Sequence, residues 1–568
     1  MTRYFVGRFA TLPALTAGVL LAACGGSDSD PGLPQLSAAT GATLSNCTAL
    51  PAGFTFANTT ISSAEVVASG GLTFAGAAVA EHCLVKGEMY RRTSAMDGNS
   101  YAIGFEMRLP KAWNGRFFYQ ANGGSDGVIW PALGSQPGPQ PSVALTQGFA
   151  VISSDAGHDG QGNLAFGVDV QARLDYGYQA VAKLTPMAKA LISSAYGKGP
   201  DRSYIGGCSN GGRHTFVAMT RMADQFDGYL AGAPGYRLPL AAIANQFGAK
   251  QYATVATDPA DLSTGFTSDE RAMVSAKVLA KCDALDGATD GMVQDTAACQ
   301  AAFDFQRDVP TCTGARDGTC LSAAQKTAIA PIFSGAVAGT GNKFYASFPF
   351  DTGHNAADSS FWEFFVSTVI DPGATALIWS TPPADPATLN PTSFALNTPI
   401  DSMIAAVRAT NTTYTESGLD LMQPVNATQL GKLKSRGAKV MVYHGVSDPI
   451  FSVNDTEAWF KGVQADNGGD ASSFSRFYRV PGMSHCGLGP STDQFDMLQS
   501  LVKWVEKGEA PQSIVAQARG AGNAVGVNPD VPASWAPNRS RPLCPYPQVA
   551  RLKVGATDLE TADSFRCE

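Results

Sequence analysis

Charged side chains are scarce in this sequence. Asp, Glu, Lys and Arg make up 15% of the 568 residues, and the formal net charge is −8. Proteins that bind nucleic acid through its phosphates carry a basic surface, so the composition excludes nucleic acid as a partner. With 44% hydrophobic residues and abundant Gly and Pro, we expect a loop-rich globular enzyme rather than a disordered chain.

The apolar run near the N-terminus is too short to span a membrane. It extends from Ala10 to Ala23, is interrupted by Pro13 and follows two arginines. A transmembrane helix needs about 20 apolar residues, so the run predicts an export signal. Its last residues, Leu-Ala-Ala-Cys, resemble a bacterial lipoprotein signal, which predicts removal of residues 1–23 and lipidation of Cys24. The alternative is an ordinary signal peptide and a secreted protein.

The residues after the signal suggest where the chain resides. Gly25 follows Cys24, which favours sorting to the outer membrane of a Gram-negative cell. Residues 24–40, rich in Gly, Ser, Asp and Pro, are expected to form a flexible tether. We expect a monomer attached to the membrane only through its lipid.

The later sequence alternates strand and helix signals. "RFFYQANGG" and "GFAVISSDAGH" end apolar runs in polar turns, and "RSYIGG" precedes a helical stretch that is followed by a short strand, "GYLAGAP". Much later, "GAKVMVYHGVSD" resumes the strand pattern, and "FSRFYRVPGMSHC" is a further strand that runs into a loop. This order predicts an α/β sheet interrupted by a long insertion. We expect an α/β-hydrolase domain in two parts, residues 41–235 and 438–568, with a lid domain over residues 236–437.

A nucleophile motif lies between a predicted strand and a predicted helix. Gly207-Cys208-Ser209-Asn210-Gly211 fits the pattern G-x-S-x-G, in which the serine occupies a sharp strand-to-helix turn. The glycines allow that turn, and the amides at the following helix N-terminus can stabilise an oxyanion. We therefore predict Ser209 as the nucleophile.

Histidine is scarce, which narrows the choice of base. Of six histidines, His354, His444 and His485 lie downstream of the nucleophile motif and the helix that follows it. The order in this fold is serine, acid, histidine. His354 lies in the insertion, and His444 ends an apolar strand where a packed residue is more common. His485, in the late loop "PGMSHCGLGP", is the predicted base, with Asp448 as its acid and Asp455 in reserve.

The eleven cysteines become ten when Cys24 is assigned to the lipid. An even number in an exported protein predicts five disulfides. The sequence does not fix their connectivity, but neighbours suggest Cys47–Cys83, Cys282–Cys299, Cys312–Cys320 and Cys544–Cys567. The remaining Cys208 and Cys486 adjoin Ser209 and His485, and would lie within disulfide reach if those two residues are hydrogen-bonded. The alternative is two buried free thiols.

The Cys-Ser and His-Cys pairs, with an aspartate between them, resemble the tannase and feruloyl esterase family of α/β hydrolases. The similarity extends over most of the mature chain, including "YIGGCSNGGR", "GYLAGAPGYRLP", "YHGVSDPIFS", "VPGMSHCGLGPSTDQFDML" and "RPLCPYPQVARLK". The resemblance implies ester hydrolysis without an organic cofactor. It also implies oxyanion-hole amides from Gly124 and Asn210, and a five-disulfide pattern like the one above.

An aspartate cluster lies between Cys282 and Cys299. Its members are Asp283, Asp286, Asp290 and Asp295. Adjacent carboxylates repel one another unless a cation neutralises them, and Ca²⁺ prefers such hard oxygen ligands. The spacing is not that of an EF-hand. The resemblance implies a structural Ca²⁺ held by Asp283, Asp286, Asp290 and the backbone carbonyls of Ala288 and Met292, which would stiffen the lid.

The substrate is predicted as an aromatic ester. The family acts on gallate, ferulate and other hydroxycinnamate esters and on a terephthalate monoester. The members that cleave the terephthalate monoester have Glu directly after the nucleophile, where this chain has Asn210. Those members hold the substrate with a Trp and an Arg, for which Trp379 and Arg408 are candidates. The lid aromatics Phe361, Trp362, Phe364 and Phe365 are expected to hold a flat acyl group.

Three alternatives stay open. The chain could be a surface-anchored binding lipoprotein without catalysis, although the complete set of Ser209, Asp448 and His485 argues against that reading. It could be an amidase or peptidase with the same residues. It could also use Cys208 as the nucleophile, which predicts sensitivity to thiol alkylation without prior reduction.

Overall fold

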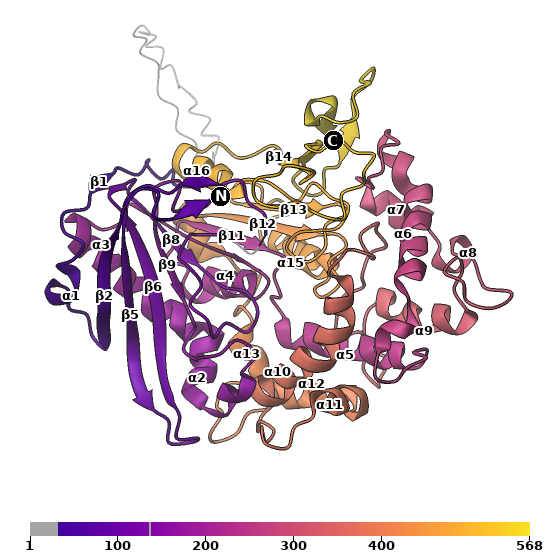
Figure 1. Cartoon of the computed structure of the whole chain (residues 1–568), viewed down its shortest axis with the longest axis horizontal. Helices are drawn as coiled ribbons and strands as arrows, with labels where there is room; N and C mark the ends of the chain where they lie inside the picture. Colours follow the sequence, from indigo (N-terminus) through magenta and orange to yellow (C-terminus); the bar gives the residue numbers. More distant parts are fainter. Residues whose placement is uncertain (1–31, 136–137) are drawn as a thin grey trace, which may run out of the picture.

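The computed structural model describes residues 32–135 and 138–568. The predicted signal peptide and Cys24 lie outside the described residues. Within them is a nine-stranded sheet in the order β13, β12, β11, β10, β8, β9, β6, β5, β2 (Figure 1). The strands are β2 (Thr59–Val67), β5 (His82–Thr93), β6 (Ser100–Pro110), β8 (Arg116–Gln120), β9 (Ala150–Ser154), β10 (Arg202–Cys208), β11 (Gly228–Gly232), β12 (Lys439–Gly445) and β13 (Ser475–Val480).

The sheet has a parallel part and an antiparallel part. Strands β8 to β13 pair in parallel, and their side chains are almost all buried, as expected for a parallel sheet covered on both faces. The sequence predicts each of these strands. Strands β2, β5 and β6 extend the sheet in antiparallel pairing and are not predicted. Exposed residues interrupt the apolar run in β2 and β5, and the buried ion pair of Glu106 and Arg108 interrupts it in β6.

Helices cover both faces of the parallel part. Adjacent residues of β10 show this, because Tyr204 packs into the same buried cluster as Leu501 while Ile205 packs into that of Met219, as the alternation of side chains along a strand requires. The first face is covered by α16 (Met497–Lys507), and the second by α3 (Ala180–Tyr196), α4 (Asn210–Arg221) and α15 (Val453–Ala465).

The chain between β11 and β12 forms a helical insertion with buried clusters of its own. Figure 1 shows α6 to α9 at the end of the molecule opposite β2 and β5. The longer helices of the insertion are α5 (Leu238–Ala253), α6 (Ser268–Cys282), α7 (Thr296–Ala302), α9 (Ala323–Ser334), η5 (Phe361–Ile370), α11 (Pro391–Asn397) and α12 (Ile400–Arg408). Short helical segments are α8 (Phe305–Asp308), α10 (Asp371–Ala374), η6 (Thr375–Trp379), α13 (Gly418–Met422) and α14 (Gly431–Ser435).

The described end of the predicted tether is held against the domain. Its last residues are bound to the body of the protein: Gln35 Nε2 donates to the carbonyl of Val505, and the amide of Ala39 donates to Glu506 Oε2 at 3.0 Å. The prediction of flexibility over residues 24–40 is therefore wrong for residues 35–40. Composition suggested a linker, but the Gln35 side chain and the Ala39 amide bond to Val505 and Glu506 on α16.

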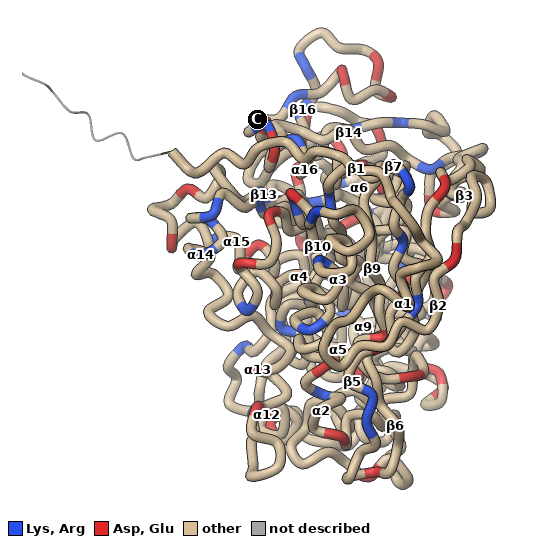
Figure 2. Tube along the Cα trace, turned by 90° about the vertical axis from the view of Figure 1, so that its left-hand side faces the viewer, with Lys and Arg blue, Asp and Glu red and all other residues tan. Residues whose placement is uncertain are grey.

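The C-terminal residues form two small antiparallel pairs, β14 (Ile514–Gln517) with β15 (Ser540–Leu543) and β16 (Ala550–Leu552) with β17 (Phe565–Cys567). Acidic and basic residues are interspersed over the trace (Figure 2). Among the described residues, no helix combines the length and apolar character needed to cross a membrane.

Candidate active site

Ser209 occupies the turn between β10 and α4. Its backbone has φ 64° and ψ −125°, a conformation that non-glycine residues rarely adopt and that is kept where the surrounding structure enforces it. The amide of Ser209 donates to the carbonyl of Gly232 at 3.0 Å, which fixes the turn to β11. The serine therefore projects from the end of the sheet, beside the N-terminus of α4, as the motif predicts.

Two glycines make this turn possible. A Cβ atom added to Gly207 or to Gly211 would lie 2.2 Å from the carbonyl oxygen of Ala121. Any larger residue at either position would push β8 and the loop after it away from the serine. Both positions require glycine because of close approach, not only because of turn geometry.

His485 and Asp448 meet at the ends of neighbouring strands. His485 Nδ1 donates to Asp448 Oδ2 at 2.7 Å, and His444 Nε2 lies 3.2 Å from the same oxygen. Burial alone would raise the pKa of Asp448, but the two histidines outweigh it and hold that pKa below its usual range. Asp448 therefore stays ionised and fixes the imidazole of His485 with Nε2 directed away from it.

The other candidate bases and the reserve acid are bonded to side chains or backbone of the protein interior. His444 is fully buried, and its Nδ1 is hydrogen-bonded to Thr456 Oγ1 at 2.8 Å. His354 accepts from the amide of Asp351 at 3.2 Å, and burial lowers its pKa to about 4. Asp455, the reserve acid, forms an ion pair with Arg237 instead. None of these side chains lines the cavity beside Ser209.

A cavity of about 1310 Å³ opens beside the nucleophile turn, and both Ser209 and His485 line it. The Nε2 atom of His485 is buried, and no described residue bonds to it. Gly124 and Asn210, which the resemblance assigns to the oxyanion hole, line the same cavity. The cavity thus brings a hydroxyl, an available imidazole nitrogen and two candidate amide donors to one space.

A disulfide links the two loops that carry these groups. Cys208 and Cys486 are bonded, with Cα atoms 6.1 Å apart and a sequence separation of 278. The neighbours of this bond are Ser209 and His485. The disulfide therefore limits how far the serine turn and the histidine loop can separate, and it leaves no free thiol at Cys208 for catalysis.

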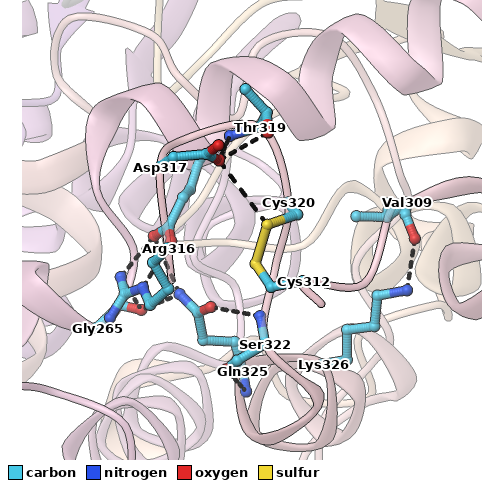
Figure 3. The surroundings of a disulfide bond; sticks show 11 residues. Gly265, Val309, Cys312, Arg316, Asp317, Thr319, Cys320, Ser322, Gln325 and Lys326 are labelled. Carbon is cyan, nitrogen blue, oxygen red and sulfur yellow. Dashed lines mark hydrogen bonds and ion pairs between the residues drawn. A yellow bond between two sulfur atoms is a disulfide. The ribbon is translucent and has the colours of Figure 1, made fainter. Parts of the chain in front are cut away.

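The other four disulfides join the neighbouring pairs that the sequence suggests: Cys47–Cys83, Cys282–Cys299, Cys312–Cys320 and Cys544–Cys567. The bond between Cys312 and Cys320 closes a small loop in the insertion. Beside it, Arg316 and Gln325 both donate to the carbonyl of Gly265 (Figure 3). This loop does not line the cavity.

The insertion supplies an aromatic wall to the cavity. Phe361, Trp362, Phe365 and Trp379 line it, whereas Phe364 packs inward against Tyr252. Arg408 at the end of α12 does not line the cavity, so its candidacy as a substrate ligand is wrong. Sequence proximity to Trp379 was its only support, and α12 directs it elsewhere.

Trp130, Asp371 and Arg519 are among the cavity residues that the sequence prediction lacks. Trp130, 45% exposed, lines the cavity from the loop after β8, and Asp371 and Arg519 line it from α10 and from the loop after β14. Trp130 follows the polar turn "NGGSDG", which was a usable signal. Nothing in the local sequence distinguishes Asp371 or Arg519, because only the folding of the insertion and the C-terminus brings them here.

The aspartate loop is neutralised in part by arginines. Asp290 pairs with Arg541 and Asp295 with Arg551, both from the C-terminal strands. Asp283 accepts from the amides of Asp290 and Gly291. These contacts offset part of the repulsion between the carboxylates, which was the basis of the calcium prediction. No group of three or more His, Cys, Asp or Glu side chains in the described chain is placed to hold a metal ion.

Asp286, unlike Asp290 and Asp295, has no basic side chain paired with it among the described residues. Its Oδ1 accepts from the amide of Ala288, but its buried Oδ2 has no partner among the described residues. Burial, followed by the nearby Asp290 and Asp283, raises the pKa of Asp286 to about 7. The residues fit a cation at this one carboxyl group, and the full ligand set stays a prediction.

The sequence matches a known family of proteins. A family model described as tannase and feruloyl esterase matches residues 83–568. The chain belongs to the tannase and feruloyl esterase family. Over 533 residues it is 37% identical to a mono(2-hydroxyethyl) terephthalate hydrolase of Piscinibacter sakaiensis, covering 87% of this chain and 86% of the relative. It is 30% identical over 438 residues to a probable feruloyl esterase B-1 of Aspergillus fumigatus, covering 72% and 74%.

Solved structures from the tannase and feruloyl esterase family share the fold. The crystal structure of feruloyl esterase B from Aspergillus oryzae aligns with a TM-score of 0.69 at 22% identity, covering 92% of this chain and 99% of that one. Tannin acyl hydrolase from Aspergillus niger aligns with a TM-score of 0.65 at 20% identity, covering 93% and 96%. The predicted α/β-hydrolase fold is confirmed.

Proposed function

We propose that this carboxylic ester hydrolase cleaves esters of aromatic acids through Ser209, His485 and Asp448. The observation that carries the proposal is the cavity that Ser209 and His485 line together, in which the buried Nε2 of His485 has no partner among the described residues. The names of its relatives support an aromatic ester as the substrate. The apolar aromatic wall from the insertion supports a flat acyl group.

The reaction proceeds in two steps. His485 Nε2 accepts the proton of Ser209, whose oxygen attacks the ester carbonyl, and the backbone amides of Gly124 and Asn210 stabilise the oxyanion. The alcohol departs with the proton from His485. Water, deprotonated by His485, then attacks the acyl-enzyme carbonyl, and His485 returns the proton to the oxygen of Ser209 as the acid is released. Asp448 keeps the ring in the tautomer that presents Nε2 and stabilises the imidazolium.

Calcium and export belong to the same proposal. Asp283, Asp286 and Asp290, with the carbonyls of Ala288 and Met292, would hold a Ca²⁺ ion that stiffens the insertion and takes no part in the chemistry; the unpartnered oxygen of Asp286 supports it. Export with a lipid at Cys24 is supported by the N-terminal sequence and by the five disulfides.

A product screen tests the function. Purified chain is incubated with methyl ferulate, methyl gallate and the mono(2-hydroxyethyl) ester of terephthalic acid, and the acids are separated by chromatography. We expect release of at least one aromatic acid, and its loss to about 10⁻³ or less in the Ser209→Ala and His485→Ala variants. The second candidate, terephthalate monoester hydrolysis, is favoured by the 37% identity, and the third substrate decides it.

Three outcomes would contradict the proposal. Unchanged turnover in Ser209→Ala would exclude this serine as the nucleophile. Faster hydrolysis of matched aromatic amides than of the esters would make the chain an amidase. If no ester is cleaved but the aromatic compounds bind, the chain is a binding protein that kept the fold.

A further inference from the structure

One carboxyl group in the cavity wall has no charged partner. Asp371, the first residue of α10, lines the cavity together with Ser209 and is only 5% exposed. Asn245 Nδ2 donates to its Oδ2 at 2.8 Å. Among the described residues, no Lys, Arg or His forms an ion pair with Asp371, and none donates a hydrogen bond to its Oδ1.

The surroundings of Asp371 are apolar. Leu164, Ile370 and Leu377 line the cavity near it, and α5 contributes only the uncharged Asn245. The titratable group within electrostatic range is the phenol of Tyr176, which burial also keeps neutral by raising its pKa. Burial raises the pKa of Asp371 itself to about 7. A carboxyl group in such a place gains most from a hydrogen-bond donor supplied by a ligand.

The cavity offers no free cation to a negatively charged ligand. Arg519 is the Lys or Arg side chain that lines it within the described residues. Its guanidinium is already bonded to Asp493, with Nη2 2.7 Å from Oδ2, and to the carbonyl of Gly526 at 2.8 Å. An aromatic acid with a second carboxylate would meet no uncommitted positive charge, and near Asp371 the two carboxyl groups would have to share a proton.

We propose that Asp371 determines the substrate class by accepting, at Oδ1, a hydrogen bond from a hydroxyl group on the substrate's aromatic ring, so that phenolic esters are preferred over esters whose ring carries a carboxylate. The apolar neighbours of Asp371 bury the ring, and the phenol supplies the donor that the protein lacks there. This inference rests on the proposed ester hydrolysis and assigns its specificity. Asp371 contacts the ring substituent and takes no part in bond cleavage.

The test compares substrates that differ in one group. Values of kcat/KM are measured for methyl 4-hydroxycinnamate, methyl cinnamate and the terephthalate monoester with the wild type, Asp371→Asn and Asp371→Leu. A hydrogen bond to this buried carboxyl group predicts that the wild type prefers the hydroxylated cinnamate by about 10-fold. Asp371→Leu removes the acceptor and should bring the ratio of the two kcat/KM values to about 1. Asp371→Asn should raise kcat/KM for the terephthalate monoester relative to kcat/KM for methyl cinnamate.

Controls separate the specificity from folding and from the proposed function. Asp401→Asn, an exposed acid of the same insertion, should leave all three ratios unchanged. If Asp371→Leu does not fold, inhibition of the wild type by free 4-hydroxycinnamate and by cinnamate gives the same comparison without a variant. An intact preference in Asp371→Leu, or equal inhibition by the two acids, overturns the inference while leaving ester hydrolysis standing. Failure of the wild type on every ester overturns both.

Discussion

The indole ring of Trp362 lies edge-on to the imidazole of His485, with centroids 4.5 Å apart and planes inclined by 73°. Trp362 Nε1 donates to Asp358 Oδ2 at 2.7 Å, and Ser484 Oγ donates to Asp358 Oδ1 at 2.8 Å. Trp362 belongs to the insertion, whereas Ser484 and His485 belong to the loop after β13. One carboxyl group therefore ties the insertion to the histidine loop, and the insertion positions the proposed base as well as covering the cavity.

Removing this contact should slow catalysis. In Trp362→Ala the imidazole loses its packing on one side, and we expect kcat to fall by about 10-fold, because small displacements of a reacting group are costly. Trp362→Phe keeps a ring but loses the bond to Asp358, so its kcat should lie between the two. Steady-state kinetics on one ester, with thermal unfolding as a check of folding, measure this. Equal kcat values in all three proteins would show that the contact is only packing.

The two disulfides that differ most in loop length should differ in function. Cys208→Ala/Cys486→Ala opens a bond that spans 278 residues, whereas Cys312→Ala/Cys320→Ala opens one that spans 8. The loop-closure model predicts losses of free energy of unfolding of about 5 and about 3 kcal/mol. Only the first should also lower kcat, since only it joins the serine and histidine loops. Chemical unfolding and ester kinetics are compared for both variants. Equal effects on kcat would contradict a link between this bond and the site.

Calcium should stabilise the chain through Asp286. A cation that binds only the folded state raises the unfolding temperature, and we expect a rise of about 2–6 °C in millimolar CaCl₂ over EDTA. Asp286→Asn should abolish the rise, while Asp401→Asn should keep it. Esterase activity at room temperature should be the same in both solutions, because the loop does not line the cavity. Identical unfolding temperatures for the wild type in CaCl₂ and EDTA would exclude a calcium site.

The buried carboxyl group of Asp371 should make stability depend on pH. Its pKa is raised to about 7 in the folded protein, against about 4 in an unfolded chain. The folded state therefore binds the proton more tightly than the unfolded chain. The stabilisation from this proton binding is fully present below about pH 4 and is lost as the pH rises to about 7. Asp371→Asn cannot ionise, so it should gain stability over the wild type across that range. Denaturant unfolding at several pH values measures the difference, and a constant difference would contradict the shifted pKa.

Local sequence signals predict the parts of the site that depend on local backbone. The glycines around Ser209 and the polar ends of β8 and β12 were visible because close approach and sharp turns leave a residue-type signature. The pair Cys208 and Cys486 carried long-range information, because each adjoins a residue of the proposed site. Asp371 and Arg519 were missed since their place depends on how the insertion and the C-terminus fold against the sheet. The arginines of the C-terminal strands that pair with the aspartate loop were missed for the same reason.

The residue after the nucleophile shows how such hidden contacts limit a prediction. Asn210 Nδ2 donates to Asp126 Oδ2 at 2.8 Å, and both residues are almost fully buried. Asp126 follows Gly124 by two residues, so this bond fixes the loop with one proposed oxyanion donor to the turn with the other. Asn210→Asp places two carboxyl groups together, and we expect a loss of free energy of unfolding of about 2–4 kcal/mol. Activity should fall with it, because the two amides are no longer held in register.

The exchanged pair distinguishes this contact from a general sensitivity of the turn. Asp126→Asn/Asn210→Asp restores one amide and one carboxylate, and Arg213, which donates to Oδ1 of residue 210, then faces the new charge. The double variant should therefore recover more than half of the lost stability and kcat, a coupling of about 1–3 kcal/mol in a double-mutant cycle. Denaturant unfolding and ester kinetics on the four proteins give the cycle. Additive losses would mean that Asp126 and Asn210 act independently, and that the oxyanion loop is fixed by other contacts.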